Sequence, residues 1–153
     1  MSLIDRVRVA SSEEIWSYPI RTLTMFKRFT YSNTTEMSTN DTSGVVYDTF
    51  IITAPPDKAV WLLGAMFTRD LRTNYESVFA ESWITRDDNL VTEGNARTNS
   101  TTYVTLKTGI WFGAFIPPDR SVRFRIWLRC SASNYYAYMK NVRVDILYAE
   151  VSV

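Results

Sequence analysis

The sequence contains no histidine, the residue that most often serves as a general base, a member of a catalytic triad or a zinc ligand. An enzyme made from this chain would have to use carboxylates, lysine, tyrosine or arginine alone. The sequence also lacks a glycine-rich phosphate-binding loop and a nucleophile elbow. We therefore expect a protein that is not an enzyme, with no catalytic residues, no cofactor and no bound metal.

Cysteine is almost absent as well. The single Cys130 excludes an intramolecular disulfide and every metal site that needs several cysteines. It follows Ile126 and Leu128 in an alternating run, which predicts a buried structural thiol rather than a nucleophile. Oxygen ligands suited to calcium occur at residues 87–89 and at Glu93, but their spacing matches no calcium-binding loop, so we interpret them as part of a solvated turn.

Neither charge is in excess, because 17 basic and 16 acidic residues nearly cancel. The sequence lacks the broad positive charge of most nucleic-acid-binding proteins, so we do not expect nucleic acid as a partner. A net charge near zero also does little to oppose self-association. No uncharged apolar stretch is long enough to cross a bilayer, and the first eight residues lack the apolar core of a secretory signal.

Aromatic residues are plentiful, at 14% of the chain, and apolar residues reach 46%, enough to build the core of one domain. Apolar residues recur with a period of two, and almost no segment has a helical period. The predicted strands are residues 21–31, 45–53, 59–68, 75–85, 101–107, 110–116, 122–130 and 136–151. About eight short strands predict an all-β, single-domain antiparallel β-sandwich of jelly-roll type over residues 21–153.

Two polar segments, 32–44 and 86–100, are expected to be long exposed loops. Thr108-Gly109 has the form of a tight hairpin turn between two of the predicted strands. Three N-x-Ser/Thr acceptor sequences fall inside the two polar segments, at Asn33, Asn40 and Asn99. Their position is compatible with a glycosylated exterior.

The tripeptide Pro-Pro-Asp occurs twice, at residues 55–57 and 117–119, each time between two apolar runs. Two prolines cannot donate to a strand ladder, so each copy predicts a strand, a stiff turn and a second strand. The match extends back to Phe50 and Phe112. Two such units predict two similar halves packed face to face, as in a double Greek key. The alternative is that a common turn occurs twice by coincidence.

Residues 1–20 are predicted to form an N-terminal arm. Ser11 and Glu14 fit a capping box, so a short helical turn is expected there, and Pro19 ends it. The first ten residues carry Leu3, Ile4, Val7 and Val9 beside three charged side chains, and the segment is too apolar to remain in water if the chain is a subunit of a particle. The arm is therefore expected to contact a neighbouring copy through Leu3, Ile4, Val7 and Val9.

The strand at 122–130 alternates apolar residues with polar ones, and its polar face carries Arg123, Arg125, Trp127 and Arg129. Residues two apart project from one strand face about 7 Å from each other, so this row of arginines can bind the carboxylates or phosphates of a partner. We predict that the row is a candidate interface.

The alternative for these arginines is pairing with acids of the next strand, such as Asp145 and Glu150. Among the five tryptophans, Trp127 is the one expected to be exposed. An exposed tryptophan beside arginine fits a platform for a sugar ring, and it fits an oligomer interface equally well.

Residues 121–128 (Ser-Val-Arg-Phe-Arg-Ile-Trp-Leu) and 136–144 (Tyr-Ala-Tyr-Met-Lys-Asn-Val-Arg-Val) resemble the closing strands of jelly-roll proteins. Viral capsid or decoration proteins and carbohydrate-binding modules share this pattern. For a compact single domain, the resemblance implies a structural protein of a virion (a minor capsid, vertex or decoration subunit) that assembles with copies of itself or with other virion proteins. The alternative is a carbohydrate-binding module that uses Trp127 and neighbouring tyrosines, with a surface glycan as its ligand.

Overall fold

The computed structural model describes residues 26–87 and 89–152 of the chain. Most of the predicted N-terminal features lie outside the described residues. They are the arm over residues 1–20, its helical turn at Ser11 to Glu14, and the interface residues Leu3, Ile4, Val7 and Val9.

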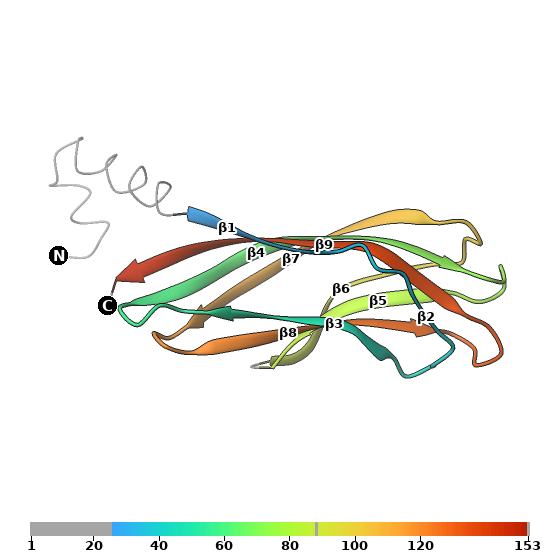
Figure 1. Ribbon diagram of the computed structural model, residues 1–153, viewed down its shortest axis with the longest axis horizontal. Helices are drawn as coiled ribbons and strands as arrows, with labels where there is room; N and C mark the ends of the chain where they lie inside the picture. The colour runs from blue at the N-terminus through green and yellow to red at the C-terminus, as the bar shows by residue number, and fades with distance from the viewer. Residues whose placement is uncertain (1–25, 88, 153) are drawn as a thin grey trace, which may run out of the picture.

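Within the described residues, nine antiparallel strands form two sheets that pack face to face (Figure 1). Sheet A contains, in spatial order, β1 (Phe26–Asn33), β9 (Ala137–Ser152), β4 (Lys58–Thr73) and β7 (Val104–Ile116), and the short β2 (Met37–Thr39) also pairs with β9. Sheet B contains β3 (Val45–Thr53), β8 (Ser121–Cys130), β5 (Ala80–Arg86) and β6 (Asn89–Thr98).

The pairing of the strands is that of a jelly roll. β5 pairs with β6, β4 with β7, β3 with β8, and β1 with β9, so each pair encloses the previous one along the sequence. The chain is therefore one long nested hairpin. Two further pairings, β4 with β9 and β5 with β8, roll this hairpin into two sheets. The predicted all-β jelly-roll sandwich is confirmed.

Both Pro-Pro-Asp turns are corners at which the chain passes from one sheet to the other. Residues 55–57 join β3 of sheet B to β4 of sheet A, and residues 117–119 join β7 of sheet A to β8 of sheet B. The amide of Ala54 donates to the carbonyl of Arg120 at 2.9 Å, and that of Asp119 donates to the carbonyl of Pro55 at 3.3 Å. The two strand-turn-strand units thus lie side by side and each contributes a strand to both sheets. The prediction that the two units pack face to face as similar halves is therefore wrong, although the jelly roll is a double Greek key.

Three of the predicted turns and loops contain strand residues. The segment 32–44 includes the end of β1 and the short strand β2. The segment 86–100 contains the edge strand β6 rather than a long loop. Thr108 and Gly109 do not turn the chain, because they continue β7 and pair with Phe67 and Met66 of β4. An edge strand has one unpaired side and tolerates polar residues, so its hydrophobic pattern is weak.

The core between the sheets follows the alternation read from the sequence. On β8 the inward residues are fully or almost fully buried; these are Val122, Phe124, Ile126, Leu128 and Cys130. The ring of Phe124 stacks on Phe50 with centroids 4.8 Å apart and meets the edge of Phe112 at 5.7 Å. The two matched phenylalanines of the Pro-Pro-Asp units therefore pack against one central ring.

Cys130 is a free thiol with no exposed surface, as the sequence predicted. Replacing it with alanine removes one buried atom from the core, so we expect the free energy of unfolding to fall by about 1 kcal/mol. Chemical denaturation of the two proteins measures this difference. If the Cys130→Ala variant folds fully but no longer makes the interactions of the unmodified protein, the role of Cys130 is not purely structural.

A charged side chain lies fully buried between the two sheets. Arg69 of β4 is fully buried, and burial lowers the pKa of its guanidinium to about 10. It donates hydrogen bonds to Ser82 Oγ and Thr108 Oγ1 at 2.7 Å each, and to the carbonyl oxygens of Gly94 at 2.7 Å, Phe67 at 3.1 Å and Ser82 at 3.3 Å. These acceptors belong to β4, β5, β6 and β7, so Arg69 bridges the two sheets.

Candidate interaction surface

The outer face of sheet A carries large apolar side chains that the core does not use. Trp111 is 77% exposed and Phe115 is 56% exposed, both on β7, and Leu147 of β9 and Met66 of β4 are each nearly half exposed. Trp61 stacks on Phe115 with ring centroids 5.3 Å apart. Contiguous exposed apolar groups of this kind mark interaction sites on soluble proteins. We call this set the sheet A patch: Trp61, Leu63, Met66, Trp111, Phe115 and Leu147.

A groove lies at the centre of the sheet A patch. Gly64 of β4 pairs with Trp111 on one side and with Leu147 on the other. Since neighbouring strands are about 5 Å apart, Trp111 and Leu147 stand about 10 Å apart with no side chain from Gly64 between them. The groove has a volume of about 470 Å³, and Leu63, Met66, Arg28 and Asp145 also line it.

The backbone requires glycine at the floor of this groove. The register of β4 shifts between Leu62 and Gly64 against both of its neighbours, so a β-bulge lies there. A Cβ atom on residue 64 would come within 2.9 Å of the carbonyl oxygen of Ile110. The bulge and the glycine together keep the groove open.

The rim of the groove carries one group of each charge. Asp145 Oδ1 accepts a hydrogen bond from Thr30 Oγ1 at 2.7 Å, and Arg143 Nε donates to Asp145 Oδ2 at 2.8 Å. The hydrogen bond from Arg143 holds the pKa of the Asp145 carboxyl below its usual value, so this group is an anion at neutral pH. Arg28 is exposed, and it makes no hydrogen bond or ion pair with the part of the chain that the structure describes.

The outer face of sheet B carries the arginine row that the sequence predicted as an interface. Arg129 Nε donates to Glu81 Oε1 at 2.5 Å, and Arg125 forms an ion pair with Asp87. Arg123 is exposed. Two of the arginines thus pair with acids, although not with the acids predicted from the sequence. A role for Arg123, Arg125, Trp127 and Arg129 in binding a partner stays a prediction.

The acids differ from those named from the sequence because β8 lies between β3 and β5 rather than beside β9. Asp145 instead bonds to Arg143, and Glu150 forms ion pairs with Lys27 and Lys58. Sequence order alone suggested that the last two strands are neighbours, which the jelly-roll connection excludes.

Trp127 is half-buried and not an open platform. Its Nε1 donates to Thr85 Oγ1 at 2.8 Å, and its ring stacks parallel to Trp83 with centroids 6.0 Å apart. Gly44 packs against the same pair of rings, because a Cβ atom there would lie 2.8 Å from Trp83. Among Trp61, Trp83, Trp111 and Trp127, the tryptophans that the structure describes, the exposed one is Trp111, which the sequence pattern did not single out.

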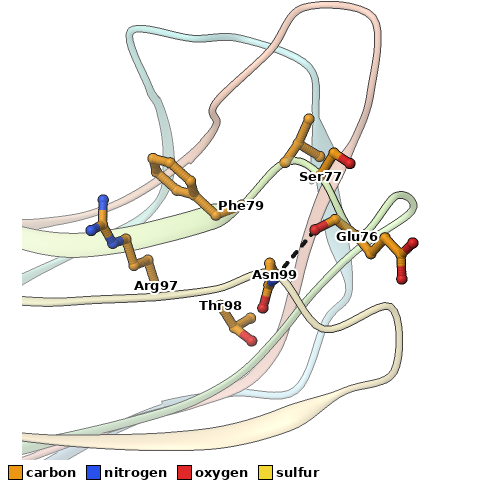
Figure 2. Close-up of a pocket in the computed structure, with 7 residues that line it drawn as sticks. Glu76, Ser77, Phe79, Arg97, Thr98 and Asn99 are labelled. Carbon is orange, nitrogen blue, oxygen red and sulfur yellow. Dashed lines mark hydrogen bonds between the residues drawn. The ribbon is translucent and has the colours of Figure 1, made fainter.

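A second hollow, of about 440 Å³, lies at one end of the sandwich between residues 76–79 and 97–99. Figure 2 shows Arg97 beside the Phe79 ring, with the guanidinium carbon 4.7 Å from the ring centroid. Arg129 approaches the same ring at 5.3 Å. Two guanidinium groups therefore pack against the ring of Phe79. Phe79 is not among the large exposed apolar residues, whereas the sheet A patch contains four of them, Met66, Trp111, Phe115 and Leu147.

The three predicted glycosylation sites differ in accessibility. Asn33 is half-buried, and its Nδ2 donates to Asp48 Oδ2 at 3.0 Å. Asn40 and Asn99 are exposed, and each donates only to a backbone carbonyl, that of Ser133 at 3.2 Å and that of Glu76 at 3.2 Å. Glycosylation stays a prediction, and it is sterically simplest at Asn40 and Asn99.

Within residues 26–87 and 89–152, no group of three or more His, Cys, Asp or Glu side chains lies close enough together to hold a metal ion. No helix of those residues has the length and apolar character needed to cross a membrane.

Comparison with known proteins does not place the chain in a family. No family model and no curated protein matches it. Similar solved structures include the CBM36-1 domain of a multidomain xylanase from the hindgut metagenome of Trinervitermes trinervoides, with 8% identity and a TM-score of 0.45 over 78% of this chain and 96% of that one. They also include infectious bursal disease virus, Gt strain, with 13% identity and a TM-score of 0.40 over 83% of this chain and 38% of that one.

A third similar structure is dimeric latent PorU from Porphyromonas gingivalis, with 7% identity and a TM-score of 0.49 over 83% of this chain and 13% of that one. The matches thus include a viral protein and a carbohydrate-binding module, the two classes that the closing strands resemble. Likeness at this level assigns no function, and the fold assignment rests on the strand order itself.

Proposed function

We propose that this protein is a structural subunit of a viral particle, as a minor capsid, vertex or decoration protein, and that it acts by self-association through the sheet A patch. The observation that carries the proposal is the exposure of Trp111, Phe115, Met66 and Leu147 together on one sheet face. Leaving these side chains in water is unfavourable, and a subunit contact would remove them from it.

The composition of the patch supports a protein partner. Tryptophan, phenylalanine and methionine are enriched at protein interfaces, and an apolar centre with a polar rim is their usual arrangement. The sheet A patch has this arrangement, with Trp111 near its centre and Arg28 and Asp145 at its edge. The near-neutral net charge of the chain adds little repulsion between copies. We also propose that the protein has no catalytic activity.

The second candidate function is carbohydrate binding, and the exposed indole of Trp111 is the observation that favours it. An open tryptophan can stack on the apolar face of a sugar ring, while Arg28 and Asp145 can bond to its hydroxyl groups. On this reading the platform is Trp111, because Trp127 is already stacked on Trp83.

Native mass in solution separates the two functions. We expect the mass, measured by sedimentation as a function of protein concentration, to rise from that of one chain to a fixed multiple of it. We expect no binding in a panel of soluble oligosaccharides followed by calorimetry. A protein that stays monomeric at every concentration and binds an oligosaccharide through Trp111 would contradict the structural role and establish the second function.

A further inference from the structure

We propose that residues 1–10 of one copy lie in the groove of the sheet A patch of a neighbouring copy, with Asp5 beside Arg28 and with Arg6 or Arg8 beside Asp145. This inference rests on the proposed self-association, and it names the segment that makes the contact. The groove has an apolar floor and a rim with one positive and one negative group.

The point at which the described chain begins supports this occupant. The first described residue, Phe26 of β1, pairs with Ala149 of β9, and Ala149 pairs with Trp61 of the sheet A patch. The preceding 25 residues therefore join the sandwich close to the patch. With residues 1–10 docked, residues 11–25 form the connection, and these 15 residues span about 50 Å when extended. This is about the length of a 16-residue strand such as β4, so the connection can reach the groove of an adjacent copy.

The chemistry of the first ten residues matches the groove. They carry Leu3, Ile4, Val7 and Val9, which suit a floor made of Leu63, Met66, Trp111 and Leu147. Their charged residues are one acid and two bases, Asp5, Arg6 and Arg8, and the rim offers one base and one acid in return. Complementary charges at a rim set the register of a docked segment more than its affinity.

A complementation experiment tests the inference. One variant lacks residues 1–10 and keeps its groove, and the other carries Leu147→Arg, which places a charge in the groove and leaves the arm intact. Leu147 is 45% exposed, so the substitution is compatible with folding, and circular dichroism of both variants checks this. We expect each variant alone to be monomeric. We expect the mixture to form a one-to-one complex in sedimentation velocity, because the arm of one variant can dock on the intact groove of the other.

A charge exchange checks the register. Asp5→Arg should weaken self-association about tenfold, a typical cost of a misplaced rim charge, and Arg28→Asp in the same chain should restore most of it. The control is Lys107→Asp combined with Asp5→Arg. Lys107 of β7 is exposed but does not line the groove, so this second substitution should not restore self-association.

The outcomes separate this inference from the proposed function. If the intact protein assembles and the variant without residues 1–10 assembles equally well, the arm is not the connector, while self-association stands. If the intact protein is monomeric and the deletion makes it associate or bind an apolar dye, the arm covers the groove of its own chain and the exchange between copies is wrong. If no form associates at any concentration, the proposed function itself fails.

Discussion

Replacing Arg69 with alanine should lower the free energy of unfolding by at least about 3 kcal/mol and should leave little folded protein at elevated temperature. The substitution removes all five hydrogen bonds of the guanidinium and leaves the carbonyl oxygens of Gly94 and Ser82 and the hydroxyls of Ser82 and Thr108 short of a donor inside the protein. It also opens a cavity between the sheets. Urea or guanidinium denaturation followed by circular dichroism measures the loss.

Two control variants are needed to interpret the loss of stability in Arg69→Ala. Arg69→Met keeps most of the side-chain volume, so the difference between the two variants separates the cavity from the lost hydrogen bonds. Arg123→Ala removes an exposed arginine and should change the stability by less than about 0.5 kcal/mol. An Arg69→Ala variant as stable as Arg123→Ala would show that Arg69 does not bridge the sheets.

Replacing Trp111 with alanine should weaken self-association by about 2 kcal/mol or more, which is roughly a 30-fold increase in the dissociation constant. The stability of the monomer should change little, because the side chain is 77% exposed and makes few contacts within the domain. Sedimentation equilibrium of the two proteins gives the dissociation constants, and thermal unfolding gives the stability.

The matched control for Trp111 is Tyr136→Ala. Tyr136 is also an exposed aromatic residue, with 42% of its surface accessible. It lies just before the first residue of β9, whereas Leu147 of the sheet A patch lies near the last residues of that strand, so Tyr136 is outside the patch. Its removal should leave association unchanged. Trp127→Ala should reduce stability, since it breaks the stack on Trp83 and the hydrogen bond to Thr85. Should Trp127→Ala abolish association while Trp111→Ala does not, the contact surface would be the arginine row of sheet B.

The strands with the clearest alternation were predictable from the sequence because one face of each is core and the other is solvent. β3 and β8 occur almost where the pattern placed them, and Cys130 of β8 is buried as expected. The two Pro-Pro-Asp turns were recognised from proline chemistry alone. The position of the two turns relative to each other could not be predicted in the same way. It depends on which strands pair within each sheet, and that is a long-range property of the fold.

The sheet A patch was missed for a local reason. Reading Thr108-Gly109 as a turn divided β7 in two, and the division hid a continuous alternation that runs from Lys107 through Trp111 to Phe115 on the outer face. Residues two apart on a strand share a face, so Trp111 lies on the same outer face as the charged Lys107, four residues before it. The error at β6 has a different cause. Its Thr, Glu, Asn and Arg residues gave the segment the composition of a loop, although an edge strand tolerates such side chains. Both errors come from local turn and polarity signals that tertiary pairing overrides.

Solvent accessibility of Trp111 in the monomer and in the assembled state tests the central claim most directly. Hydroxyl-radical footprinting with mass spectrometry, at concentrations below and above the association midpoint, reports the oxidation rate of Trp111 and Phe115, with Tyr136 as an internal reference. The account predicts that oxidation of Trp111 and Phe115 falls several-fold on assembly while that of Tyr136 stays constant. Equal oxidation of Trp111 in both states would contradict the claim that the outer face of sheet A is the assembly surface.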